Sequence, residues 1–199
     1  MAAPGTARPG GRTARIAESV FAAAIAELAD RAYADISVES IAARAGVHKT
    51  TVYRRWGSKP ELIRQALAGA AGTHIQVPDT GRADTDARML ARAVQAILAA
   101  PQGAAITTAL IVGGLSSPEI AELMRQFWAG RLAAIEVIVA RAVGRGELPP
   151  GTDPAAFMHA VSAPLYFRLL VTREPITEPD ADAAADAALA AARAGVFSR

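Results

Sequence analysis

The stretch Ser37–Leu62, SVESIAARAGVHKTTVYRRWGSKPEL, decides the fold that we expect for this chain. Ile41 and Ala45 lie on one stripe of a short helix, and Val52 marks the buried side of a second short helix. Gly46 stands between the two, at a position where a left-handed backbone conformation costs glycine little. We therefore predict two short helices joined by a tight turn.

Helix-start signals divide this region further. Ser37 is a good N-cap for the first short helix. Ser58 and Glu61 form the capping-box pattern S-K-P-E, which predicts the start of a further helix. Upstream, apolar residues at three- and four-residue spacing predict a helix over residues 12–31 that packs across the two short ones.

The second short helix carries polar side chains on its outward face. Two helices joined by a tight turn are the layout of a helix-turn-helix, whose second helix enters the major groove of DNA. Arg55 is expected to point away from the groove, and Trp56 to close the core. The outward residues, which suit phosphates and base edges, are His48, Lys49, Thr50, Thr51, Tyr53 and Arg54.

These side chains have different expected roles. Arg54 suits a bidentate contact with a guanine, and Thr50 or Thr51 suits a thymine methyl group. The expected phosphate contacts, which position the protein without specifying the base sequence, are His48, Lys49, Tyr53 and Lys59. Two alternatives stay open: Tyr53 as a half-buried core residue and His48 as a helix cap.

Residues 12–67 resemble the DNA-binding motif of the TetR family of bacterial transcriptional regulators. The resemblance rests on the SVxxIAxxAGV core, the TTVYRRW recognition helix and the GSKPEL helix entry. It implies a DNA-binding head followed by a helical body that dimerises and binds a small effector. It also implies that Ser37 and Val38, at a helix N-terminus that favours anions, face the DNA backbone.

Composition places the whole chain in the all-α class. Alanine, the best helix former, supplies much of the 52% apolar content of the 199 residues. Cysteine is absent, and no apolar run approaches the roughly 20 residues that span a bilayer. Residues 1–70 carry ten Lys and Arg against six Asp and Glu, whereas the remainder carries eleven against thirteen. A basic head on a mildly acidic body suits a DNA-reading protein.

We expect about nine helices in three segments: a disordered basic arm (1–11), a helix-turn-helix domain (12–67) and a regulatory, ligand-binding and dimerisation domain (68–199). Gly113 and Gly114 are expected to end one body helix, and Pro164 to kink another. The helices expected in the body cover residues 86–99, 104–112, 118–143, 154–172 and 178–194.

The resemblance also implies a two-fold homodimer and an effector site in the body. The expected interface residues, on the last two helices, are Phe157, Val161, Leu165, Leu169, Ala185, Ala188, Leu189 and Ala192. The expected effector-lining residues are Met89, Met124, Phe127, Trp128, Arg131, His159 and Tyr166. Because few charges lie among them, we expect an apolar or weakly polar effector. In both sets, packing within the body's own core stays open as the alternative.

Other functional classes lack their sequence motifs. HExxH, GxSxG, P-loop and dinucleotide-binding patterns are absent, so we predict no enzymatic activity, no cofactor and no metal. The modest charge argues against a DNA-packaging protein. A regulator that answers to a protein partner, or that has no ligand, stays the alternative. We expect a cytoplasmic homodimer that binds a double-stranded DNA operator and no membrane, with repression as the family default.

Overall fold

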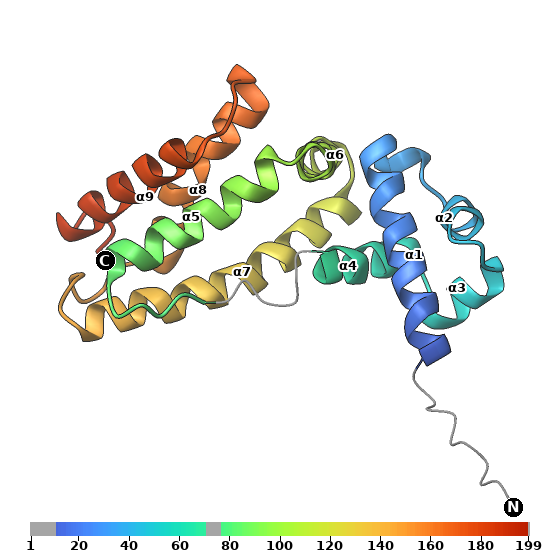
Figure 1. The fold of residues 1–199 in the computed structure, drawn as a ribbon, viewed down its shortest axis with the longest axis horizontal. Helices are drawn as coiled ribbons and strands as arrows, with labels where there is room; N and C mark the ends of the chain where they lie inside the picture. The colour runs from blue at the N-terminus through green and yellow to red at the C-terminus, as the bar shows by residue number, and fades with distance from the viewer. Residues whose placement is uncertain (1–10, 71–76, 199) are drawn as a thin grey trace, which may run out of the picture. The chain divides into compact units, whose positions relative to one another are not determined.

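The computed structural model describes residues 11–70 and 77–198, so nearly all of the expected arm lies outside the described residues. The described residues form nine α-helices, one 3₁₀ turn and one π-helical turn, and no strand (Figure 1). The all-α prediction is thus confirmed. The helices are α1 (Gly11–Asp30), α2 (Val38–Arg44), α3 (Lys49–Trp56), α4 (Lys59–Ala70), α5 (Ala83–Ala99), α6 (Pro101–Ser116), α7 (Pro118–Gly144), α8 (Pro154–Phe167) and α9 (Glu178–Arg193).

The chain divides into two compact units, residues 1–71 and 72–199, which we call the head and the body. In the head, α1 packs against α2 and α4, and α2 packs against α3. The rings of Phe21 and Trp56 lie 5.7 Å apart between centroids, so Trp56 closes the core as predicted. The fully buried side chains of this core include Val20, Leu28, Ile41, Val52, Leu62 and Ile63.

Local sequence signals set the helix ends in the head. The Ser37 hydroxyl accepts a hydrogen bond from the Ser40 amide at 3.0 Å and so caps α2, as predicted. Gly46 has a φ of +67° and makes the turn between α2 and α3, also as predicted. The Glu61 amide donates to the Ser58 hydroxyl at 3.4 Å, which is one half of the predicted capping box.

In the body, α5, α7, α8 and α9 enclose one apolar core. Helix α9 packs along both α5 and α8, and α7 packs on α8. The side chain of Phe157, only 1% exposed, is the largest of the fully buried ones. The buried face of α9 is almost entirely alanine, which allows the close approach of neighbouring helices; it comprises Ala181, Ala184, Ala185, Ala188, Leu189 and Ala192.

Helix α5 begins at Ala83, three residues before the predicted start. Asp86 is not at the beginning of the helix but in its first turn, where its side chain is completely buried. One carboxylate oxygen accepts hydrogen bonds from both the amide and the hydroxyl of Thr80, each at 2.8 Å. Asp86 therefore holds the preceding loop against the helix.

The predicted ends of α6 are wrong, because glycines there serve close packing. Helix α6 continues through Gly113 and Gly114 to Ser116. A Cβ atom on Gly113 would lie 2.6 Å from Cδ1 of Ile120, so the absence of a side chain lets α6 approach α7. At the other end, α6 begins at Pro101 and meets α5 at an angle of 89°.

Helix α8 and the π-helical turn after it, Arg168–Thr172, form one apolar stretch that contains Pro164. By length and composition alone, residues 154–172 could cross a membrane, but this is weak evidence, because the core helices of soluble proteins pass the same test. In the body, Val161 and Leu165 of this helix are completely buried against its own neighbours.

Candidate DNA-binding surface and body cavity

The N-terminus of α2 offers backbone donors rather than the Val38 side chain. Val38 is buried at 5% exposure, so the predicted contact with DNA is restricted to its main chain. The Ser40 amide is already bonded to Ser37. The amides of Val38 and Glu39 belong to the first turn, which lacks intrahelical partners. These two N–H groups suit a phosphate oxygen.

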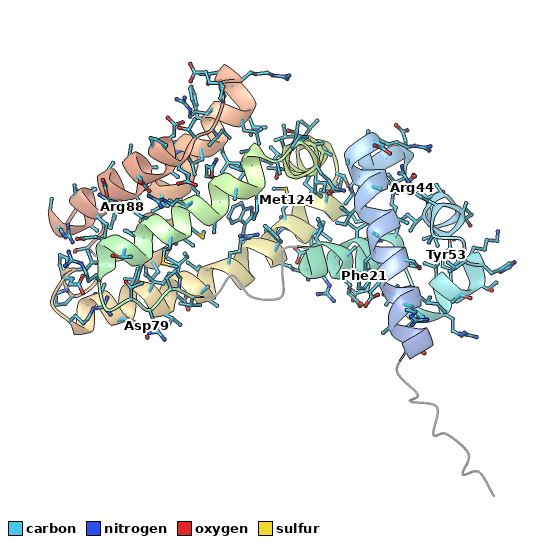
Figure 2. All side chains as sticks on the ribbon, viewed as in Figure 1. Phe21, Arg44, Tyr53, Asp79, Arg88 and Met124 are labelled. Atoms are coloured by element: carbon cyan, nitrogen blue, oxygen red, sulfur yellow. The ribbon has the colours of Figure 1, made fainter. Side chains whose placement is uncertain are left out.

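Helix α3 presents one polar face to solvent and one apolar face to the head core. Val52 and Trp56 are buried, whereas Tyr53, labelled in Figure 2, is 45% exposed. Arg54 is exposed and makes no hydrogen bond or ion pair with any residue that the structure describes. Its guanidinium is therefore available for a bidentate contact with a base, the role expected of it.

Other side chains on this face already have neighbours. A ring nitrogen of His48 lies 2.9 Å from the hydroxyl of Thr50, and His48 occupies the N-cap position of α3 without a side-chain bond to the backbone. The ammonium of Lys49 lies 3.6 Å from Glu39, with both side chains about half exposed. Thr51 is half-buried. Such an exposed pair is weak, so Lys49 can exchange Glu39 for a phosphate.

Lys59 does not belong to this surface, which corrects the prediction of a phosphate contact. Its ammonium donates hydrogen bonds to the main-chain carbonyls of Tyr33 at 3.1 Å and Ile36 at 3.0 Å. The same nitrogen lies 4.0 Å from the centroid of the Tyr33 ring. Lys59 thus ties the start of α4 to the loop before α2 and is occupied within the head.

An ionic link between α1 and α2 was not predicted. Arg44, labelled in Figure 2, donates to Glu27 at 2.9 Å and to Asp30 at 2.5 Å. The hydrogen bond to Asp30 is the largest cause of the raised pKa of Arg44. Glu27 is only 4% exposed. Its position beside the apolar stripe of α1 was the signal in the sequence for a buried acid that needs a partner.

The body contains an open cavity of about 830 Å³ between the C-terminal half of α6, α7 and α8. Its lining is mostly apolar: Ile111, Gly114, Leu115, Ala121, Met124, Arg125, Trp128, Ala129, Leu132, Ala155, Met158, His159, Ser162, Ala163, Tyr166 and Leu170. Four residues predicted to line an effector site, Met124, Trp128, His159 and Tyr166, lie here together. A fifth, Met89, does not, because it is 49% exposed on α5.

The two other predicted lining residues, Phe127 and Arg131, lie beside this cavity rather than in its lining. The rings of Phe127, Trp128 and Tyr166 follow one another at centroid distances of 5.7 Å. The guanidinium carbon of Arg131 lies 4.4 Å from the centroid of Phe127. Burial raises the pKa of the Tyr166 hydroxyl, and burial also lowers the pKa of Arg131.

The residues predicted for a dimer interface are in the body's own core instead. Seven of them are no more than 2% exposed: Phe157, Val161, Leu165, Ala185, Ala188, Leu189 and Ala192. Leu169, in the π-helical turn, is half-buried and packs against the same core. A partner chain cannot contact the seven without opening that core, so the alternative of internal packing is correct for them.

The flank of α9 is occupied by two ion pairs to α5. Arg88 and Asp186 form two hydrogen bonds of 2.8 Å, and Arg92 and Asp182 form two of 2.7 Å. The hydrogen bond from Arg92 is the largest cause of the lowered pKa of Asp182. These ion pairs occupy the flank of α9 that faces α5.

Two protein-family models match this chain, one on each compact unit. The model for bacterial regulatory proteins of the tetR family matches residues 20–66. The model for the tetracyclin repressor-like C-terminal domain matches residues 77–188, which is more than half of the chain. The chain belongs to the TetR family. It is therefore a DNA-binding transcriptional regulator of the helix-turn-helix type, as the resemblance implied.

Individual members of the TetR family are similar over most of the chain. The HTH-type transcriptional regulator AqdR of Rhodococcus erythropolis is 33% identical over 142 residues, which is 71% of this chain and 68% of that protein. The DNA-binding transcriptional repressor TetR of Mycobacteroides abscessus is 33% identical over 157 residues, which cover 76% of this chain and 80% of that protein. Among solved structures, the TetR-family regulator SCO0332 is 26% identical with a TM-score of 0.70, covering 88% of this chain and 97% of that one.

Proposed function

We propose that this TetR-family protein is a repressor that binds a palindromic operator as a homodimer and is released by a small, largely apolar effector. The observation that carries the proposal is the exposed face of α3, where Arg54 is free and Lys49 is only weakly paired. An α-helix with such a face fits the major groove, where Arg distinguishes guanine from the other bases. The related protein from Mycobacteroides abscessus is itself a repressor.

Two copies of the head are needed, because one short helix reads too few bases for a specific site. A two-fold dimer places two such helices on the two halves of a palindrome. The outward faces of α8 and α9 are the proposed contact surface, in place of the buried residues predicted from sequence. On α9 and its C-cap residue, small exposed side chains recur at helical spacing and allow close approach: Ala183, Ala187, Ala190 and Ala194.

The cavity between α6, α7 and α8 is the proposed effector site. Its volume of about 830 Å³ lies in the range of small-molecule pockets, and its lining is apolar with a few polar groups. The effector would favour one spacing of the two heads over another, and by linkage this lowers the affinity for the operator. The protein would act in the cytoplasm, where the DNA is accessible.

Fluorescence anisotropy of the full chain on labelled DNA tests this proposal. DNA from upstream of its own gene is compared with a scrambled duplex at physiological salt. A preference of about a thousandfold or more, saturating at an even number of chains per site, is expected for a specific dimeric regulator. Equal, weak binding of both duplexes would contradict specific recognition of that operator.

A further inference from the structure

One partly buried arginine of the body has no carboxylate partner. Each arginine of the body that the structure describes has an acidic partner within ion-pair distance, except Arg131 and the exposed Arg173. The Nε atom of Arg131 is buried and has no hydrogen-bond partner. A buried donor without an acceptor is costly, and the cost is larger for a charged group.

The neighbours of Arg131 supply ring faces, but no acceptor with a negative charge. Its guanidinium carbon lies 4.4 Å from the centroid of Phe127. The ring of Phe127 lies 5.7 Å from that of Trp128, which lines the cavity together with Tyr166. The Tyr166 hydroxyl makes no hydrogen bond with the residues that the structure describes. Arg131 and Tyr166 thus belong to one aromatic cluster beside the cavity, and each has an unused donor.

The charge of this cluster differs from that of the cavity lining. Trp128 and Tyr166, with ring centroids 5.7 Å apart, are the two aromatic members of the cluster that line the cavity. Arg125, the arginine in the cavity lining, is already paired with Glu122 at 2.5 Å. The site thus offers a large apolar volume with one unpaired positive charge at its edge.

We propose that the effector is an amphipathic acid, whose apolar part fills the cavity and whose carboxylate-like group is bound by Arg131 and the Tyr166 hydroxyl. This inference rests on the proposed effector site. The Nε atom of Arg131 is already buried in the free protein, so the loss of its hydration is not a further cost of binding an anion. Hydrogen bonds to charged groups contribute about 1.5–3 kcal/mol, or roughly ten- to hundredfold in affinity.

Isothermal titration calorimetry with three matched compounds tests the inference on the full chain. Octanoate, 1-octanol and octylamine share one apolar tail and differ in the charge of the head group. We expect octanoate to bind roughly tenfold or more tightly than 1-octanol, and octylamine to bind most weakly. In Arg131→Met, octanoate should bind no more tightly than 1-octanol, while the affinity for 1-octanol is retained. Arg131→Lys should keep part of the preference.

Arg141→Met is the matched control, because Arg141 lies on the same helix but pairs with Asp79 at 3.4 Å. It should keep the full preference for octanoate, and circular dichroism verifies that each variant is folded. Equal affinities for octanoate and 1-octanol, or a preference for octanoate that survives in Arg131→Met, would overturn the inference that the effector is an acid. The proposed effector site would not be affected by either result. If none of the three compounds binds to protein that still binds its operator, the inference and the proposed effector site both fail.

Discussion

Arg54 and Arg55 are adjacent in sequence but are held differently. Arg54 has no partner among the described residues, whereas Arg55 donates to the carbonyl of Thr13 at 3.1 Å and lies 5.1 Å from the Trp56 ring centroid. Only the first is free to enter a groove. Similarly, Lys49 is exposed, while Lys59 is bonded to two carbonyls. At the scale of single residues, a free cation and an occupied one differ in function although their charges are equal.

The arginine pair gives the first prediction. Arg54→Ala should cost about 1–3 kcal/mol of operator binding and relax the preference at one base position in each half-site. Arg55→Ala, the matched control, should leave the base preference unchanged, because its guanidinium is used within the head. Anisotropy titrations against operators substituted at every position measure both. A uniform loss on all sequences in Arg54→Ala would contradict base readout.

The lysine pair gives the second prediction. Lys49→Ala should reduce the slope of log affinity against log salt by about 0.9, since one phosphate contact is lost. Lys59→Met should leave that slope unchanged and lower the thermal unfolding midpoint, because it removes the link from α4 to Tyr33 and Ile36. Binding titrations at several salt concentrations and thermal melts distinguish the two. An unchanged slope in Lys49→Ala would exclude a phosphate contact there.

At the scale of helices, the corner between α5 and α6 depends on a glycine. A Cβ atom on Gly103 would lie 2.1 Å from the carbonyl oxygen of Ile97, closer than any real contact. On α7, by contrast, a Cβ atom on Gly130 would have no neighbour within 4 Å. The two glycines therefore have opposite requirements, although both lie within helices.

Gly103→Ala should destabilise the body by about 1–3 kcal/mol, because backbone at the corner must move apart to admit the methyl group. Gly130→Ala should be neutral or stabilising by up to about 1 kcal/mol, since alanine is the better helix former. Urea denaturation followed by circular dichroism compares the two variants. A Gly103→Ala protein as stable as Gly130→Ala would show that the corner is not closely packed.

Sequence patterns predicted the elements but not their partners. The outward face of α3 and the cap at Ser37 are local features, so periodicity and composition sufficed to place them. The partners of Lys59 are carbonyls 23 and 26 positions away, which no pattern reveals. Gly113 resembles a helix end in sequence, yet it serves a contact with Ile120. The alanine face of α9 indicated close packing, but not that the packing is internal.

At the scale of the whole molecule, folding is coupled to pH through the acidic partners of arginine. Hydrogen bonds from Arg92 and Arg193 are the largest causes of the lowered pKa values of Asp182 and Asp84. Hydrogen bonding to Arg64 lowers the pKa of Glu61 to about 2. A carboxyl group whose pKa is lower in the folded protein than in the unfolded one stabilises the folded state. This stabilisation is complete above the unfolded-state pKa, near pH 4, and is lost as the pH falls through the folded-state pKa.

The thermal unfolding midpoint should therefore change little between pH 7 and about pH 5 on account of these groups, and should fall steadily below about pH 4. Asp182→Asn should lower the unfolding midpoint at pH 7. It should also reduce the difference between the midpoints at pH 7 and pH 3, because the variant lacks the contribution of the ionised Asp182 at both values. Melts in matched ionic strength measure the difference. A midpoint that stays constant down to pH 3 would contradict a role for these pairs in stability.

The tethering of Lys59 has a practical consequence for chemistry on this protein. The chain has only two lysines, Lys49 and Lys59, and both lie in the head. An amine-reactive reagent should acylate the exposed Lys49 quickly and Lys59 slowly, because the nitrogen of Lys59 is engaged with two carbonyls and a ring. Operator DNA should then shield Lys49 as well. Mass spectrometry after brief labelling would thus report occupancy of the recognition helix from a single side chain, with an internal reference ten residues away.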